Sequence, residues 1–281
     1  MKLHNIPALC LFLTLGCNQS TESSANKNLP AQDKPNTAYG NDAQQKMDIY
    51  LPAGRDENTR TIILLHGGGW SGGSKSDLAY FVPMLKSQFP NHAIVNMNYR
   101  LGTSASPGFP KQIQDIEKAI AHLQNSNYDI SNEYAFIGAS AGAHLGLLYA
   151  YHHDPKREVK AVVSIVGPAD FSDPAYTGNP LFQFGLSSLI GYVNVQQNPE
   201  VYLEVSPATH VSAQSPPTAM FYGGQDQLIP ASQGPRLKAK LDEYNVYNEL
   251  HFYPSGGHGN WNSTINADFQ AKLIAFLKQR F

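Results

Sequence analysis

The sequence predicts an α/β domain in which a mostly parallel central sheet is covered by helices on both faces. Short runs rich in β-branched and aromatic residues are expected as strands, at residues 47–51, 62–65, 93–97, 134–137, 161–166, 218–222 and 249–253. Longer amphipathic segments separate them and are expected as helices, at residues 77–88, 109–124, 141–151, 232–244 and 267–281. Because apolar strands alternate with helices, both faces of the sheet are expected to be covered.

Two segments refine this architecture. In residues 109–124, Ile113, Ile116 and Ile120 recur at spacings of three and four residues, which predicts a helix with one buried stripe. Residues 168–212 interrupt the alternation and are rich in proline and aromatic residues, so we expect a short cap insertion over the edge of the sheet. The aromatic side chains of the insertion could wall a site or form the core of short cap helices, and the sequence favours neither.

The composition excludes several classes of protein. The chain has 281 residues, with 20 Lys and Arg against 22 Asp and Glu and a formal net charge of −2. Without a basic run, this balance argues against a nucleic-acid partner. The two cysteines are Cys10 and Cys17, so no disulfide, thiolate metal site or cysteine nucleophile is expected after residue 17.

The N-terminus has the pattern of an export signal. Lys2 precedes an almost wholly apolar run over residues 6–15, and the following Gly16-Cys17 resembles the lipobox of bacterial lipoproteins. We expect a signal peptide at residues 1–16, with plain secretion as the alternative to lipidation of Cys17. A lipidated Cys17 would anchor an exported bacterial protein to a membrane, in the periplasm or at the cell surface. Residues 17–45, polar after Cys17, are expected to be a flexible tether to a folded domain at residues 46–281.

The strongest chemical signal is the segment Gly138-Ala139-Ser140-Ala141-Gly142. It follows the strand predicted at 134–137 and begins the helix predicted at 141–151. This context is the one that a G-x-S-x-G nucleophile elbow requires, because a tight strand-to-helix turn exposes the serine hydroxyl. The helix N-terminus behind Ser140 favours developing negative charge.

A second signal follows the strand predicted at 62–65, in the segment His66-Gly67-Gly68-Gly69-Trp70. Consecutive glycines leave the backbone free to turn its amides toward a ligand. We expect the amides of Gly68 and Gly69, together with that of Ala141, to form an oxyanion hole. His66 is expected to brace this loop, and Trp70 is a candidate for the rim of the substrate pocket.

A nucleophilic serine needs a general base and an acid that orients it. His258 lies on a Gly-rich loop after the strand predicted at 249–253, and Asp226 lies on a loop after the strand at 218–222. His144 is the rival base, but it lies along the elbow helix and is expected to pack in the core. Asp170 is the rival acid, and its alternative role is to cap the insertion.

The chain order Ser140, Asp226, His258 is the order found in α/β-hydrolases. The chain resembles the hormone-sensitive-lipase group of α/β-hydrolase esterases and, in detail, the bacterial bifunctional feruloyl and acetyl-xylan esterases. The resemblance covers residue 47 to the C-terminus; besides the elbow and the Asp226 and His258 loops, it includes Asp48-Ile49-Tyr50-Leu51-Pro52, His66-Gly67-Gly68-Gly69-Trp70, Asn98-Tyr99-Arg100-Leu101 and Phe109-Pro110 followed by Asp115. Departures from the pattern, Ala143 after the elbow and a short insertion, concern substrate shape.

The resemblance implies a serine carboxylesterase that cleaves short acyl or aryl esters through an acyl-enzyme, without a metal or an organic cofactor. Ser140 would be the nucleophile, His258 the base and Asp226 the orienting acid. The substrate would be a small molecule or an acetyl or feruloyl ester on a polysaccharide. An arylformamidase or peptidase using the same triad, or a non-catalytic surface lipoprotein, remain alternatives. Arg100 resembles a structural anchor of the family, and Trp261 is expected to pack beneath the His258 loop.

Overall fold

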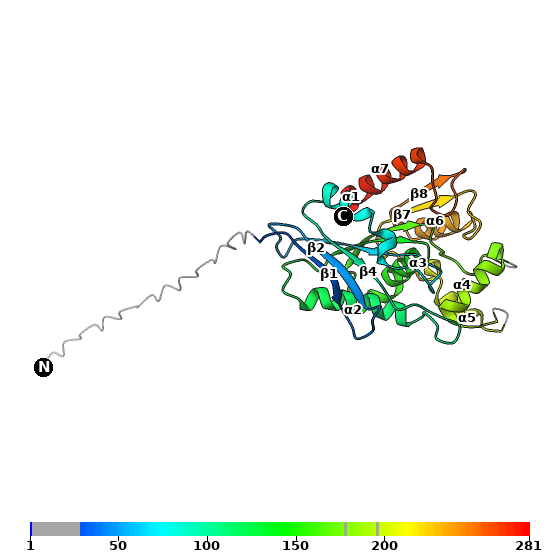
Figure 1. Cartoon of the computed structure of the whole chain (residues 1–281), viewed down its shortest axis with the longest axis horizontal. Helices are drawn as coiled ribbons and strands as arrows, with labels where there is room; N and C mark the ends of the chain where they lie inside the picture. The colour runs from blue at the N-terminus through cyan, green and yellow to red at the C-terminus, as the bar shows by residue number, and fades with distance from the viewer. Residues whose placement is uncertain (2–28, 177–178, 195–196) are drawn as a thin grey trace.

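The computed structural model describes residue 1 and residues 29–176, 179–194 and 197–281. The expected lipid-bearing Cys17, and the signal peptide apart from Met1, lie outside these ranges. The described chain is built around an eight-stranded sheet with the order β1-β2-β4-β3-β5-β6-β7-β8 (Figure 1). The strands are β1 (Gln32–Ala38), β2 (Lys46–Leu51), β3 (Thr61–Leu65), β4 (Ala93–Met97), β5 (Tyr134–Ala139), β6 (Val159–Ile165), β7 (Thr218–Gly223) and β8 (Asn248–Tyr253).

Neighbouring strands pair in parallel across the part of the sheet formed by β4, β3, β5, β6, β7 and β8. Strand β2 pairs with β4 in the antiparallel direction, and β1 pairs with β2 in the same way. In the register, Leu65 of β3 lies beside Gly138 of β5, and Gly223 of β7 lies beside Tyr253 of β8. The loops that follow these strands therefore leave the sheet at the same side, at the carboxyl ends of its parallel strands. This side is where open α/β sheets hold their ligands.

Helices cover both faces of the sheet. They are α1 (Phe81–Gln88), α2 (Lys111–Asn125), α3 (Ala141–Leu148), α4 (Pro180–Ile190), α5 (Pro199–Glu204), α6 (Gln233–Glu243) and α7 (Ser263–Arg280). The buried side chains of α2, α3 and α6 belong to one apolar cluster, and those of α1 and α7 belong to the other. Alternate residues of β3 divide between them, because successive strand side chains point to opposite faces. The predicted α/β fold with a mostly parallel sheet is confirmed.

Strands β2 to β8 and four of the five predicted helices lie close to their expected positions. The helix expected at 77–88 is instead a 3₁₀ turn, Lys75–Leu78, followed by α1. Pro83 accounts for the break, because a proline ring clashes with the carbonyl group four residues earlier in a helix. The α3 helix also ends in a π-helical turn, Tyr149–His153. Within the described residues, no helix is long and apolar enough to cross a bilayer.

The expectation of a tether up to residue 45 is wrong for its last part. Residues 32–38 form β1, which pairs with β2 along the edge of the sheet. The strand is mostly exposed on both faces, so its sequence lacks the alternation of apolar and polar residues that signals a strand. Tyr39 and Gln45 are buried as well, and the Gln45 amide donates to Asp115 at 2.7 Å.

The cap insertion contains the helices α4 and α5. Phe171, Tyr176 and Phe182 form an aromatic cluster inside it, with the rings of Tyr176 and Phe182 stacked at a centroid distance of 3.6 Å. The insertion is also bonded to the body, since the Gln233 side chain accepts from the amides of Ala169 and Asp170. Aromatic packing therefore supplies part of the interior of the cap, together with aliphatic side chains such as Leu186 and Leu189.

Candidate active site

The elbow between β5 and α3 holds Ser140 in a conformation that few serines adopt. Its backbone dihedrals are φ 50° and ψ −118°, and its amide donates to the carbonyl of Ile165 at 2.8 Å. A Cβ at Gly138 would lie 2.5 Å from the Cα of Ala143, and one at Gly142 would lie 2.1 Å from the carbonyl oxygen of Leu65. Both positions therefore require glycine so that β3, β5 and α3 can approach closely.

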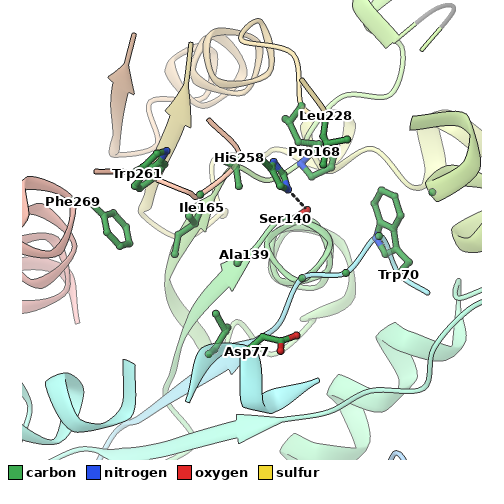
Figure 2. A pocket seen from close by; sticks show the side chains of 18 of the residues that line it. Trp70, Asp77, Ala139, Ser140, Ile165, Pro168, Leu228, His258, Trp261 and Phe269 are labelled. Atoms are coloured by element: carbon green, nitrogen blue, oxygen red, sulfur yellow. Dashed lines mark hydrogen bonds between the residues drawn. The ribbon is translucent and has the colours of Figure 1, made fainter. Parts of the chain in front are cut away.

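Ser140, His258 and Asp226 are brought into one hydrogen-bonded chain. The Oγ of Ser140 lies 2.9 Å from Nε2 of His258, and Nδ1 of His258 lies 2.8 Å from Oδ2 of Asp226 (Figure 2 shows the first contact). Because a carboxylate only accepts, Nδ1 carries the proton and Nε2 is left to accept from the serine hydroxyl. The Asp226 side chain is 1% exposed, and its other oxygen accepts from the amides of Leu228 and Ile229.

The loops carrying Asp226 and His258 are bonded to each other. The amide of Gly224 donates to the carbonyl of Tyr253, and that of Gln225 donates to the carbonyl of Gly256, each at 2.8 Å. A Cβ at Gly223 would lie 2.3 Å from the Gly256 carbonyl oxygen. The parallel pairing of β7 and β8 thus continues into the loops and fixes the spacing between the acid and the imidazole.

The glycine loop after β3 lies against the elbow. A Cβ at Gly67 would lie 3.2 Å from Cβ of Ser140, and Gly68 and Gly69 have φ values of 114° and 56°. Within the described chain, the amides of Gly68 and Gly69 donate to no backbone or side-chain acceptor. Ala141 is the first residue of α3, so its amide has no acceptor one turn earlier in the helix. The three amides expected as an oxyanion hole are therefore donors without helical or loop partners.

His66 braces this loop as expected. Its ring stacks on Tyr99 at a centroid distance of 4.2 Å, and its Nδ1 donates to the Gly67 carbonyl at 2.7 Å. Burial lowers the pKa of His66, which keeps the ring neutral. The Tyr99 hydroxyl in turn donates to the His66 carbonyl at 2.6 Å. These contacts support the start of the glycine loop, and His66 is not among the residues that line the cavity at Ser140.

The rival residues do not join the Ser140 hydrogen-bond chain. Both ring nitrogens of His144 are bonded elsewhere, and Asp170 forms an ion pair with Arg236 at 2.6 Å. The adjacent His152 and His153 lie beside the cap, where His152 stacks on His210 at 3.8 Å. In the ranges that the structure covers, no group of three His, Cys, Asp or Glu residues is placed to hold a metal ion.

A mostly apolar cavity of about 530 Å³ opens at Ser140. Figure 2 shows Trp70 on one side of Ser140 and Trp261 with Phe269 on the other. Cap residues Phe182 and Gly185 also line the cavity, whereas Phe171 and Tyr176 pack within the cap. Of the aromatic residues of the insertion, Phe182 therefore lines the cavity and Phe171 and Tyr176 pack in the cap, whereas Phe184 and Tyr192 are exposed.

Several cavity residues were not anticipated from the sequence. Asp77, Leu78 and Tyr80 come from the segment before α1, and Asn266 and Phe269 come from α7. They belong to no motif, and only the three-dimensional packing of these helices against the sheet identifies them. Leu228 and Ile229 could have been found, because they directly follow Asp226 in a loop already assigned to the site.

The structure places Trp70 and Trp261 at the cavity and Arg100 in an ion pair outside it. Trp70 lines the cavity although it is only 3% exposed. The Trp261 indole donates to the Gly257 carbonyl at 3.0 Å, beneath the His258 loop, and its ring also lines the cavity. Arg100 forms an ion pair with the fully buried Asp115 at 2.7 Å, which anchors the chain between β4 and α2.

A serine–histidine–aspartate chain at the carboxyl edge of a parallel sheet, facing glycine-loop amides, defines the serine hydrolases of the α/β-hydrolase fold. The chain belongs to the BD-FAE family, whose model matches residues 47–241. This is the bifunctional feruloyl and acetyl-xylan esterase type that the sequence motifs resemble.

The chain is also similar to individual proteins of known sequence or structure. The esterase LipC of Mycobacterium tuberculosis is 28% identical over 242 residues, covering 79% of this chain and 58% of LipC. The chain thus spans little more than half the length of this curated relative. A truncated carbohydrate esterase from gut microbiota has the same fold, with a TM-score of 0.74, 23% identity and coverage of 90% of this chain and 98% of that one. An acetyl ester-xyloside bifunctional hydrolase from Caldicellulosiruptor lactoaceticus superposes with a TM-score of 0.68 and 19% identity, covering 83% and 88% of the two chains.

Proposed function

We propose that the protein is a serine carboxylesterase that hydrolyses short acyl or aryl esters through an acyl-enzyme intermediate. The observation that carries the proposal is the hydrogen bond from Ser140 to Nε2 of His258, at 2.9 Å, beside an apolar cavity. A serine hydroxyl is a weak nucleophile until a neighbouring base removes its proton. Membership of the BD-FAE family and the similarity to the esterase LipC support the same chemistry.

In the first half-reaction, Ser140 Oγ forms a bond to the ester carbonyl carbon while its proton moves to Nε2 of His258. The oxygen of the tetrahedral intermediate accepts from the amides of Gly68, Gly69 and Ala141, which have no backbone acceptor of their own among the described residues. Asp226 stabilises the imidazolium through Nδ1. His258 then donates its proton to the leaving oxygen, the ester C–O bond breaks, and the alcohol departs.

In the second half-reaction, water attacks the acyl-enzyme and gives its proton to His258. The bond between the acyl carbon and Ser140 Oγ then breaks, and the serine recovers its proton from the imidazolium. The carboxylic acid product leaves, and it ionises in water at neutral pH. Each proton transfer in this sequence passes through Nε2 of His258, which the Asp226 contact holds toward Ser140.

The cavity favours acyl or aryl groups attached to a polar alcohol. Its walls are mainly apolar and aromatic, but Asp77 and Asn266 also line it and can bond to hydroxyl groups. We therefore extend the proposal to acetyl or feruloyl esters linked to a polysaccharide. The solved carbohydrate esterase of the same fold supports this extension.

The test is a substrate panel with a Ser140→Ala control. It contains p-nitrophenyl acetate, methyl ferulate, acetylated xylan and N-formylkynurenine. We expect the wild-type protein to release acetate or ferulate and the Ser140→Ala variant to release neither above background. Hydrolysis of N-formylkynurenine alone would assign an arylformamidase instead, and no turnover of any substrate would leave only a binding role.

We also propose that Cys17 is lipidated after removal of residues 1–16 and anchors the protein to a membrane. The apolar run at residues 6–15 followed by Gly16-Cys17 supports this location. Full-length protein expressed in bacteria with an alkyne fatty acid should be labelled and should sediment with membranes. Cys17→Ser should abolish both, whereas the matched variant Cys10→Ser should retain them. Labelling that survives Cys17→Ser would contradict the proposal.

A further inference from the structure

His144 is a buried imidazole with two specific hydrogen bonds that the esterase steps do not use. Nε1 of Trp70 donates to Nδ1 of His144 at 3.0 Å, and the carbonyl of Val205 accepts from Nε2 at 2.7 Å. An indole only donates and a carbonyl only accepts, so the proton of His144 is on Nε2. Burial lowers the pKa of His144 to about 4, so the ring is neutral at pH 7. Its tautomer and its orientation are therefore fixed by two partners.

Trp70 occupies a position that needs such support. It directly follows Gly69 and has a φ of 61°, in the left-handed region that residues with a Cβ rarely adopt. Its carbonyl accepts from the amide of Gly102 at 2.7 Å and from the side chain of Gln112 at 2.8 Å. These two bonds hold the backbone of Trp70, and the bond to His144 holds the far end of its side chain.

His144 connects three parts of the site. It lies on α3, one turn after Ser140, and its backbone amide donates to the Ser140 carbonyl at 3.0 Å. Its ring meets the Trp70 ring edge to face, with an interplanar angle of 89°. Val205, its third contact, belongs to the cap and follows α5. One side chain thus joins the nucleophile helix, the glycine loop and the cap.

We propose that His144 is a positioning residue for the oxyanion hole. By holding the indole of Trp70, it keeps the amides of the adjacent Gly68 and Gly69 in a fixed position relative to the hydroxyl of Ser140. This inference rests on the proposed esterase function, since it concerns the same site. A role as general base does not fit, because neither ring nitrogen is free. A role in packing alone predicts that a ring of similar shape without polar atoms would serve equally well.

The discriminating variants are His144→Phe and His144→Gln. Phenylalanine keeps a planar ring but can neither accept from Trp70 nor donate to Val205. Glutamine keeps one acceptor and one donor on a planar group and serves as the rescue variant. Each variant is measured with p-nitrophenyl acetate after titration of active sites with a fluorophosphonate, so that misfolded protein does not enter kcat.

We expect His144→Phe to lower kcat by about 10- to 100-fold and to change KM by less than about threefold. The loss should be smaller than that caused by removing one oxyanion-hole donor, which lowers kcat by about 10²- to 10³-fold. His144→Gln should recover most of this loss. Inhibition by a trifluoromethyl ketone, whose adduct with Ser140 carries an oxyanion, should weaken in parallel with kcat. Inhibition by the matching methyl ketone should not change. An unchanged kcat in folded His144→Phe, or equal weakening of both ketones, would overturn the proposal.

A double-mutant cycle isolates the bond itself. Trp70→Phe removes the indole donor and keeps an aromatic ring against His144. If the two residues act through their mutual bond, the double variant should lose no more activity than the worse single variant. Additive losses would show that the residues act independently and would overturn the proposal. If His144→Phe fails to fold, Trp70→Phe with His144 intact still tests the proposal, because it removes the same hydrogen bond and should lower kcat; an unchanged kcat in Trp70→Phe would overturn the proposal.

A readout without turnover separates this inference from the proposed function. The chain has two tryptophans, so ¹⁵N spectra should show two indole N–H signals. The Trp70 signal should exchange slowly with solvent in the wild type and about 10-fold or more faster in His144→Phe. The Trp261 signal, bonded to Gly257, is the internal reference. If the wild type hydrolyses no ester, the proposed function fails. If instead the Trp70 signal keeps its protection in His144→Phe, the positioning role fails.

Discussion

The elbow and the cap lie on either side of the same cavity, but different physical features determine them. In the elbow, backbone approaches as close as those at Gly138 and Gly142 leave space for one arrangement of the chain. In the cap, aromatic side chains pack against one another, and a Cβ at Gly185 would lie at an ordinary 3.4 Å from the Trp70 ring. The elbow that carries Ser140 is therefore held by close backbone contacts, whereas the cap residues at the cavity are held by side-chain packing that tolerates substitution.

The largest effect is expected at the elbow itself. Ser140→Ala should lower kcat by about 10⁴-fold or more, since removing a triad serine eliminates the covalent route. The melting temperature should change little, because the methyl group fits where the hydroxymethyl group was. Ester hydrolysis and thermal unfolding measured on the same preparation test both parts. Retention of more than about a hundredth of the activity would show that another group acts as nucleophile.

Asp226→Asn should lower kcat by about 10³- to 10⁴-fold, because an amide at this position favours the wrong tautomer of His258. The matched control is Asp170→Asn, at the entrance to the cap, where the carboxylate pairs with Arg236. This control should keep activity within a few-fold of the wild type. Equal losses in the two variants would contradict the assignment of the acid to the Asp226 loop.

The contrast between the two regions is tested directly by adding the same methyl group to each. Gly142→Ala should destabilise the fold by about 2–3 kcal/mol, because the new Cβ would overlap the carbonyl oxygens of Leu65 and His66. Gly185→Ala, inside α4, should instead stabilise by up to about 1 kcal/mol through helix propensity. Denaturant unfolding measures both. Opposite signs are expected, and a stable Gly142→Ala variant would show that the elbow is less constrained than its geometry indicates.

The stability of the wild type should fall as the pH is lowered from about 6.5 to 4. Buried His144 stays neutral down to a pKa of about 4, whereas the imidazole in the unfolded chain binds its proton near 6.5. Between these values the unfolded state binds more protons, so acid favours unfolding, by up to about 3 kcal/mol for this group. Burial also lowers the pKa of His153 to about 4, so part of the slope should remain without His144. The melting temperature should depend less on pH across this range in His144→Gln than in the wild type. The same dependence of melting temperature on pH in both proteins would contradict the burial of a neutral His144.

The smallest effect is expected inside the cap. The Tyr176 hydroxyl is buried and has no hydrogen-bond partner among the described residues. Tyr176→Phe should therefore stabilise the protein by about 1 kcal/mol, since an unpaired buried hydroxyl is unfavourable. The esterase rate should stay within about twofold because Tyr176 does not line the cavity. Destabilisation would indicate that the hydroxyl is bonded in solution.

The sequence predicted the parts of the molecule that short motifs determine. The glycines of the elbow allow close backbone contacts, and Gly68 has a positive φ. The positions of the elbow and of the glycine loop could therefore be inferred from these residues alone. The strand β1 could not, because a strand exposed on both faces is held by backbone hydrogen bonds and carries no alternation of apolar and polar residues. Asp77 and Asn266 could not be found either, since only the packing of distant helices brings them to the cavity.

In the proposed mechanism, Asp226 and His258 make the hydroxyl of Ser140 nucleophilic. Diisopropyl fluorophosphate tests this activation directly, because attack by Ser140 Oγ on phosphorus expels fluoride and leaves a stable covalent adduct. Intact-mass and peptide analysis should find one diisopropylphosphoryl group, on Ser140, and His258→Ala should slow its formation by about 10³-fold or more. An adduct on another residue, or equally fast labelling of Ser140 without His258, would contradict the account.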